Sequence, residues 1–206
     1  MDALEKLVEL FRQFPGIGPR QARRFAYFLL VRGPGFSREL ATRARALEER
    51  VRSCELCFRF FETKQEGDSV CRTCSDRHRD GALLLVVAHD VDADAIEASG
   101  SYKGYYFILG GTVPIAEKNP EKKIRSAAFL AAVEQRAKHE LKELILGMNA
   151  TPDGEHTALH LRSILLPLVA KYALTISTLG RGLSTGTELE YSDTETLRSA
   201  LTHRTH

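Results

Sequence analysis

Cys54-Glu-Leu-Cys57 and Cys71-Arg-Thr-Cys74 are two Cys-x2-Cys pairs that lie thirteen residues apart and contain all four cysteines of the chain. Each pair can form a tight turn that directs both sulfur atoms to one point, and a zinc ion accepts four thiolates in tetrahedral geometry. The spacing therefore predicts a structural zinc site with these four cysteines as ligands. Four sulfur atoms complete the coordination shell, so no position remains for a catalytic water.

The same cysteines would form two disulfides in an oxidising compartment. However, the first residues, Met1 to Leu10, are charged and lack the apolar core of a secretory signal peptide. The longest apolar run, Ala82 to Ala88, is far shorter than the roughly 20 residues that a membrane-spanning helix needs. We therefore expect a cytoplasmic protein with no membrane segment, whose reduced cysteines bind zinc.

The positive charges of the chain are concentrated before the cysteines. The 206 residues carry a formal net charge of only +2, yet residues 10–52 contain ten arginines and three glutamates. This local excess of seven positive charges indicates a polyanionic partner for the N-terminal part of the chain.

A glycine turn between two predicted helices lies within this basic region. Residues 3–13 have apolar residues at helical spacing, the turn Gly16-Ile-Gly-Pro19 follows, and proline suits the first position of the next helix. Glycines let the main chain approach a phosphate, which the positive end of the helix dipole attracts. We therefore predict a DNA-backbone site made of a small set of residues: Gly16, Gly18, Arg20, Arg23 and Arg24. The alternative is an ordinary helical hairpin whose arginines are only solvated.

The second helix of this hairpin is expected to end at Gly33-Pro34-Gly35, because both residue types interrupt helices. Ser37 is then placed to cap the N-terminus of a third helix that runs to about Val51.

After the cysteines, short apolar strands alternate with helices. The strands are expected at residues 82–87, 105–109, 143–148 and 174–179, and the helices at 92–99, 123–139, 155–172 and 193–201. This alternation predicts an α/β fold with a mostly parallel sheet and helices on both faces.

Acidic residues follow the first and third of these strands, at the edge where parallel sheets bind ligands. Asp90 follows the first strand, and Asp153 and Glu155 follow the third. These carboxylates suit Mg²⁺, the capping of helices or a basic partner equally well. The sequence contains no Gly-x4-Gly-Lys-Ser/Thr phosphate loop and no Gly-x-Ser-x-Gly nucleophile turn.

Taken in order, these motifs closely resemble the bacterial recombination protein RecR family, over nearly the whole chain. The likeness rests on the glycine turn, the four cysteines, the acidic α/β region and three further stretches, 102–111, 153–158 and 181–190. It implies a helix-hairpin-helix in residues 1–53, a four-cysteine zinc finger in 54–79, a Toprim domain in 80–173 and a small C-terminal assembly segment with a Walker-B-like sequence in 174–206.

The resemblance also implies a function. Members of this family form ring-shaped tetramers able to encircle DNA, and with RecO and RecF they help load RecA onto gapped DNA. We therefore expect a non-catalytic DNA clamp of recombinational repair, with Arg20 and Arg24 matching the family's basic hairpin positions. Two alternatives are a Mg²⁺-dependent Toprim-type nuclease or topoisomerase, and a monomeric zinc-containing interaction protein that binds nucleic acid.

The sequence departs from the Toprim pattern at one decisive position. Toprim enzymes place a glutamate, which acts as general acid and base, at the end of the first strand. Here Val86-Val87 is followed by Ala88, which can neither transfer a proton nor bind a metal. We therefore expect no enzyme activity and no functional Mg²⁺, and we assign Asp90, Asp153 and Glu155 to a partner-binding surface or a vestigial Mg²⁺ site.

Overall fold

The computed structural model of the chain describes residues 2–65, 67–180, 182–183, 186 and 188–202. It forms two compact units, residues 1–52 with 62–64 and residues 53–61 with 65–206, which are described separately. The C-terminal segment expected at 174–206, with its Walker-B-like sequence, includes residues 181, 184, 185, 187 and 203–206, which lie outside the described residues.

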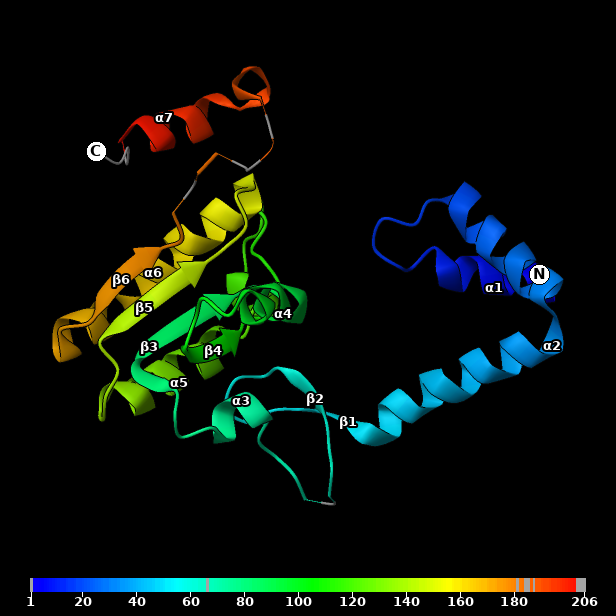
Figure 1. Ribbon diagram of the computed structural model, residues 1–206, viewed down its shortest axis with the longest axis horizontal. Coiled ribbons are helices and arrows are strands. Elements are labelled where there is room, and N and C mark those ends of the chain that lie inside the picture. Colours follow the sequence, from blue (N-terminus) through cyan, green and yellow to red (C-terminus); the bar gives the residue numbers. More distant parts are fainter. Residues whose placement is uncertain (1, 66, 181, 184–185, 187, 203–206) are drawn as a thin grey trace. The chain divides into compact units, whose positions relative to one another are not determined.

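The first unit is a helical hairpin made of α1 (Ala3–Phe11) and α2 (Pro19–Arg50) (Figure 1). The carboxylate of Asp2 caps α1 by accepting a hydrogen bond from the Glu5 amide at 2.8 Å. Val8 of α1 packs on Ala22 and Ala26 of α2, and all three are buried. The small alanine side chains let the two helices approach closely, so the hairpin has a core of its own.

The predicted interruption of α2 is present, but it differs from the expectation in detail. Gly33 has φ 80° and ψ 178°, outside the helical region, and helical conformation resumes at Pro34. The expectation that Ser37 caps the following helix is wrong. Gly33 takes the capping position because Pro34 suits the first helical residue, and the Ser37 hydroxyl donates to the Gly33 carbonyl oxygen at 3.4 Å.

The residues around both cysteine pairs belong to the second unit. Two short strands, β1 (Val51–Ser53) and β2 (Phe60–Glu62), pair with each other, and the short helix α3 (Arg72–Ser75) follows. The first cysteine pair lies between β1 and β2, and the second pair lies at the start of α3.

The rest of the second unit is built on a four-stranded parallel sheet with the order β4-β3-β5-β6. Its strands are β3 (Asp80–Val87), β4 (Gly104–Ile108), β5 (Glu143–Gly147) and β6 (Thr175–Thr178). All four strands and the parallel pairing were expected from the sequence. The α/β fold is therefore confirmed.

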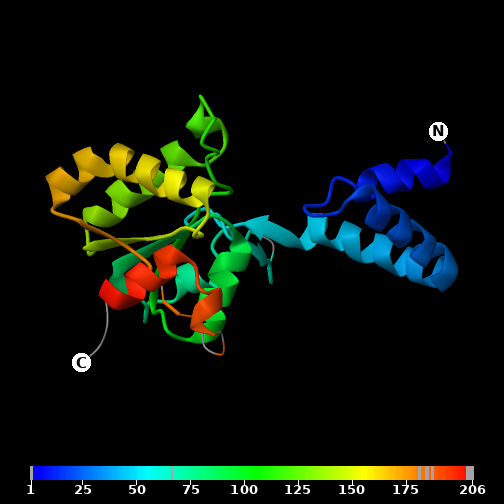
Figure 2. The same ribbon diagram turned by 90° about the horizontal axis from the view of Figure 1, so that it is seen from above.

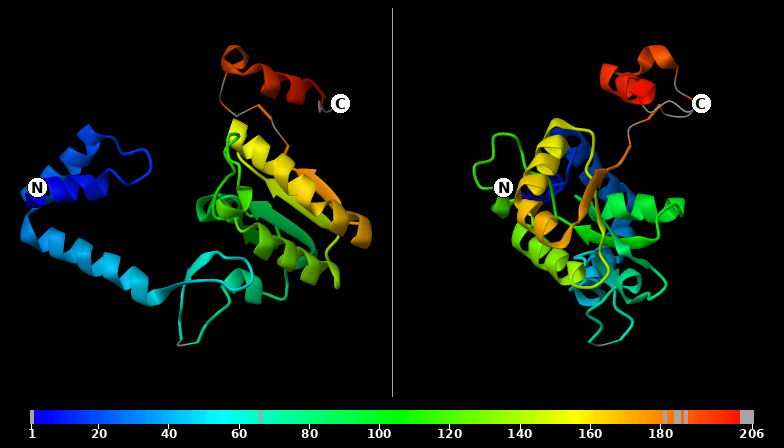
Figure 3. Two further views of the ribbon diagram at one scale, coloured as in Figure 1. Left: turned by 180° about the vertical axis from the view of Figure 1, so that it is seen from behind. Right: turned by 90° about the vertical axis from the view of Figure 1, so that its left-hand side faces the viewer.

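Helices cover both faces of this sheet, as Figures 2 and 3 show. On one face α5 (Ser126–Ala137) and α6 (Pro152–Tyr172) pack on Leu84 and Val86 of β3. On the other face α4 (Asp90–Ser99) packs on Leu85 and Val87. Alternate residues of a strand point to opposite faces, so the uninterrupted apolar run of β3 is buried from both sides.

The remaining described elements are short. They are η1 (Pro120–Lys122), η2 (Leu189–Tyr191) and α7 (Thr194–Thr202). Among the described residues, no helix combines the length and the apolar character needed to cross a membrane.

Candidate metal centre and nucleic-acid interface

The four cysteines of the predicted zinc site converge on one point. Their sulfur atoms all lie within 4.8 Å of one another, and the Sγ atoms of Cys57 and Cys71 are 3.6 Å apart. A tetrahedral zinc ion with bonds of about 2.3 Å holds its sulfur ligands about 3.8 Å apart, so this arrangement fits zinc. In the described part of the chain, it is the only group of three or more His, Cys, Asp or Glu side chains placed to hold a metal ion.

Local hydrogen bonds direct these sulfur atoms inwards. The Phe58 amide donates to the Cys54 carbonyl oxygen at 2.9 Å and closes the first turn. The Cys71 amide donates to Cys54 Sγ at 3.4 Å. Hydrogen bonds from the Cys57, Cys71 and Cys74 thiols lower the pKa of the Cys54 thiol far below its usual value. Hydrogen bonds within the same cluster raise the pKa of the Cys57 and Cys74 thiols, so the four sulfur atoms hold their protons unequally when no ion is bound.

The first cysteine turn also pairs with the open edge of the sheet. The Leu109 amide, just after β4, donates to Val87 of β3 at 2.9 Å, so the amide of the preceding residue, Ile108, points away from β3. That amide donates to the carbonyl oxygen of Cys57 at 2.8 Å. The cysteine-containing loop thus satisfies a donor on an edge strand that would otherwise be unpaired.

Phe58 anchors this turn in the core. Its φ of 63° lies in the left-handed region, which costs a non-glycine residue of order 1 kcal/mol. Its ring packs edge-on against Phe107 of β4, with centroids 5.3 Å apart, and the Arg125 guanidinium lies 5.2 Å from the centroid of the same ring. These contacts offset the strained backbone and fix the loop on the sheet.

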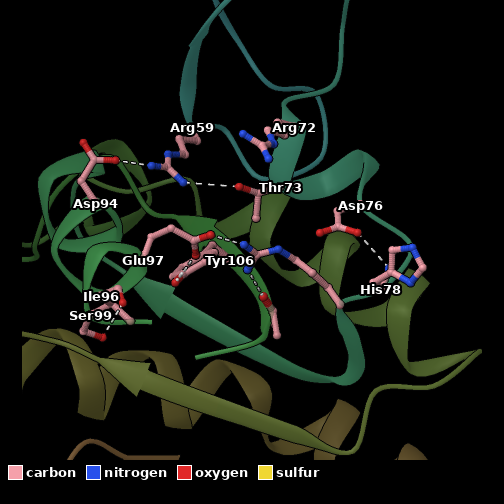
Figure 4. Close-up of polar contacts among 12 residues, drawn as sticks. Arg59, Arg72, Thr73, Asp76, His78, Asp94, Ile96, Glu97, Ser99 and Tyr106 are labelled. Atoms are coloured by element: carbon pink, nitrogen blue, oxygen red, sulfur yellow. Dashed lines mark hydrogen bonds and ion pairs between the residues drawn. The ribbon is translucent and has the colours of Figure 1, made fainter. Parts of the chain in front are cut away.

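Two arginines beside the cysteines bind carboxylates on α4, as Figure 4 shows for the first of them. Arg59 pairs with Asp94, and Arg79 pairs with Glu97, whose second oxygen accepts from the Tyr106 hydroxyl at 2.8 Å. Burial alone would raise the pKa of Glu97, but the hydrogen bonds from Arg79 and Tyr106 lower it and keep the group charged. No signal in the sequence predicts this network, because its partners lie 35 and 18 residues apart and follow no motif.

The three carboxylates assigned to a partner-binding or vestigial Mg²⁺ site have separate surroundings. Asp90 Oδ1 accepts from the Phe60 amide at 2.7 Å, and Asp153 Oδ1 accepts from the Ile115 amide at 3.2 Å. Glu155 lies in the first turn of α6, beside a cavity of about 280 Å³. Two of the three carboxylates therefore bind backbone amides of their own unit, and the three form no metal-binding group within the described residues.

Ala88, which stands where Toprim enzymes have their glutamate, directly follows β3 and is fully buried. A buried methyl group cannot take part in proton transfer, so this end of the sheet lacks a general acid or base at that position.

The predicted DNA-binding residues lie together at the hairpin turn. Gly16 has φ 74°, in the left-handed region, and Gly18 is the N-cap of α2 with Pro19 next to it. Arg20 and Arg24 are exposed and lie four residues apart on α2. Neither has a hydrogen-bond or ion-pair partner among the described residues.

Arg23 differs from these two arginines. It is also exposed, but its guanidinium binds Glu5 of α1 at 3.0 Å. This ion pair links α1 to α2. Because Glu5 already binds its guanidinium, Arg23 is less available to a phosphate than Arg20 and Arg24 are.

Comparison with known proteins identifies the family. The RecR helix-hairpin-helix profile matches residues 4–49, and the Toprim domain profile matches residues 82–179. Recombination protein RecR of Magnetococcus marinus is 36% identical to the chain over 206 residues, which are 99% of this chain and 96% of the relative. The chain belongs to the RecR family.

Other RecR proteins agree with this assignment. RecR of Treponema pallidum is 34% identical over 98% of this chain and 94% of its own length. RecR of Bifidobacterium animalis subsp. lactis is 35% identical over 98% of this chain and 95% of its own length. The match therefore extends across both units of this RecR family member, including the stretch with the four cysteines between the two profile matches.

We expect one zinc ion per chain, and we expect its removal to lower the melting temperature, because the ion stabilises only the folded arrangement of the four thiolates. Metal analysis and thermal unfolding followed by circular dichroism, with and without a chelator, measure both. Restoring zinc after chelation is the control. A metal-free protein with an unchanged melting temperature would contradict the structural role.

Asp90→Ala should lower the free energy of unfolding by about 1 kcal/mol, because the Phe60 amide loses its acceptor. Asp90→Asn keeps an oxygen at the same place and should retain most of the stability. Urea denaturation of the two variants measures the difference. Equal losses in both variants would show that the charge of Asp90, rather than its acceptor oxygen, is what the fold requires.

Proposed function

We propose that this RecR family member is a non-catalytic DNA-binding protein of recombinational repair. In this proposal it acts in the cytoplasm as a ring-shaped tetramer around DNA, and with RecO and RecF it helps to load RecA onto gapped DNA. Family membership over almost the entire chain supports the repair role. The observation that carries the DNA-binding role is the exposed pair of arginines at the hairpin turn, which have no partner within the described residues.

The hairpin suits a phosphate for three reasons. The first amides of α2 have no partner within the helix and point out of its N-terminus, where the helix dipole is positive. Gly18 has no atom within 4 Å of the place where a Cβ would stand, so a phosphate can approach the main chain closely. Arg20 and Arg24 add two guanidinium groups beside this point. None of these contacts reads a base, so binding should have little sequence preference.

A single hairpin offers few phosphate contacts, and each is weak in physiological salt. A ring of identical chains multiplies these contacts, because after the first hairpin binds, the others meet the same strand at a high effective concentration. The tetramer in our proposal therefore converts weak sites into a stable clamp. The C-terminal segment, residues 174–206, is proposed as an assembly contact.

We propose zinc as the ion of the four-cysteine site, with Cys54, Cys57, Cys71 and Cys74 as its ligands. The ion supplies a fixed tetrahedral link between two turns and no reaction chemistry. In our division of the chain this zinc finger, residues 54–79, joins the helix-hairpin-helix of 1–53 to the Toprim domain of 80–173.

The absence of catalysis in our proposal rests on the end of β3. Ala88 supplies no acid or base, and the carboxylates of Asp90 and Asp153 already accept hydrogen bonds from backbone amides. Mg²⁺ is therefore not part of the proposed function. We propose that this acidic region, with Glu155 in the first turn of α6, faces a protein partner instead.

Arg20→Glu with Arg24→Glu should abolish DNA binding in a gel-shift titration, because two attractive contacts per hairpin become repulsive. Arg38→Glu with Arg45→Glu is the matched control: both arginines are exposed on the later part of α2, and the change in net charge is the same. The control should retain most of the affinity. Unchanged binding in the first variant, or equal loss in both, would refute the hairpin site.

Light scattering coupled to size exclusion should give about four times the mass of the 23.0 kDa chain. A mass of one chain at micromolar concentration, with DNA binding retained, would contradict the ring and favour the monomeric interaction protein.

A further inference from the structure

A cleft of about 450 Å³ lies in the second unit between the cysteine-containing loop and α4. We call it the arginine cleft, and the residues that matter for its chemistry are Arg59, Arg72, Thr73, Asp76, Arg79 and Glu97. Figure 4 shows that Arg59, Arg72 and Thr73 lie close together at this place. The cleft adjoins the metal-binding loop at Cys71, and it is distinct from the DNA-binding hairpin, which belongs to the first unit.

Two of its arginines are fixed in place. Arg59 binds Asp94 and donates to the Thr73 hydroxyl at 3.5 Å, and its side chain is 18% exposed. Arg79 binds Glu97 and donates to the Gly104 carbonyl oxygen at 2.9 Å, and its side chain is 12% exposed. Side chains already held in one orientation lose little conformational entropy when a ligand binds.

The cleft nevertheless has donors to spare. The Nε atom of Arg79 is buried and has no hydrogen-bond partner. Arg72 is exposed, and within the described residues its guanidinium has no partner at all. A buried donor without an acceptor is unfavourable, so an anion that came within hydrogen-bond distance of Arg79 Nε would remove an existing cost.

The acidic residues around the cleft do not accept hydrogen bonds from Arg79 Nε or from the Arg72 guanidinium. Both oxygens of Glu97 already accept, one from Arg79 and one from Tyr106, and Asp76 Oδ1 accepts from the His78 amide at 2.9 Å. Asp94 lies on α4 and pairs with Arg59, but it does not line the cleft. The side chains that line the cleft carry three positive charges, on Arg59, Arg72 and Arg79, against two negative charges, on Asp76 and Glu97, so the cleft favours an anion over a cation.

From these contacts we propose that the arginine cleft binds a phosphate group. The planar guanidinium fork matches the oxygens of a phosphate, and a charge-assisted hydrogen bond to an arginine is stronger than a neutral one. The volume is large enough for a group bigger than a free phosphate ion. The phosphate comes from a nucleotide or from a nucleic-acid strand, and Arg72 is the residue that reaches it first from solvent.

The test uses the full-length, zinc-loaded protein and observes the arginine Nε–H signals by nuclear magnetic resonance. Inorganic phosphate, deoxyadenosine monophosphate and a single-stranded oligonucleotide are titrated in turn. The oligonucleotide is added to the Arg20→Glu, Arg24→Glu variant, so a failure of the hairpin site does not affect the result. We expect the Arg79 Nε–H signal to shift with at least one probe, and the tightest probe identifies the source of the phosphate.

Arg72→Ala should weaken that binding about tenfold, the size of effect expected for one charge-assisted contact. It should leave the melting temperature unchanged, because the Arg72 side chain is exposed and has no partner in the described part of the chain. Arg77→Ala is the matched control, since Arg77 is exposed in the same loop but does not line the cleft. No shift with any probe, or equal weakening by both variants, would overturn the proposal.

Discussion

The geometry of four sulfur atoms around one point constrains the cysteine-containing loop and its attachment to the sheet. Cys54 and Cys57 belong to one turn and Cys71 and Cys74 to another, so bringing their sulfur atoms within 4.8 Å fixes both turns at once. The first turn then presents the Cys57 carbonyl oxygen to the Ile108 amide on the open edge of the sheet. Because β4 has β3 on one side only, this contact pairs one donor on an edge that would otherwise be available to another chain.

The same attachment explains what the acidic residues after β3 do. In a Toprim enzyme this end of the sheet would contribute to metal chemistry. In this chain Asp90 binds the Phe60 amide and Asp94 binds Arg59, so the acids of α4 fasten the cysteine-containing loop to the sheet. With Ala88 in place of the acid-base residue, the region has the character of a rigid support. Such a support fits the proposed function, in which the chain positions DNA and its partners and needs no reactive group.

Much of this architecture could be predicted from the sequence, because the signals are local. The strands are short apolar runs between helices, and their pairing follows from the βαβ alternation. The cysteine site follows from its spacing, since two Cys-x2-Cys turns can direct four sulfur atoms to one ion. Gly16 marks the hairpin turn because its left-handed backbone favours glycine, and Gly18 with Pro19 marks the start of the next helix.

The errors and omissions concern contacts between distant residues or competing local signals. Ser37 is a good helix cap by type, but Gly33 with Pro34 supplies a better start four residues earlier. The pairs Arg59–Asp94 and Arg79–Glu97 arise only when the loop folds back onto α4, and nothing in the sequence marks them. For the same reason the sequence could not distinguish Asp90 as a metal ligand from Asp90 as an acceptor for a backbone amide.

Hydrogen exchange at the Ile108 amide tests most directly whether the contact between the first cysteine turn and the sheet edge depends on zinc bound to the four cysteines. The account predicts that zinc removal greatly reduces protection of this amide, whereas the amides of β5 in the sheet interior remain protected. Equal protection of the Ile108 amide with and without zinc would contradict the account, because the turn would then pair with β4 regardless of its four sulfur ligands.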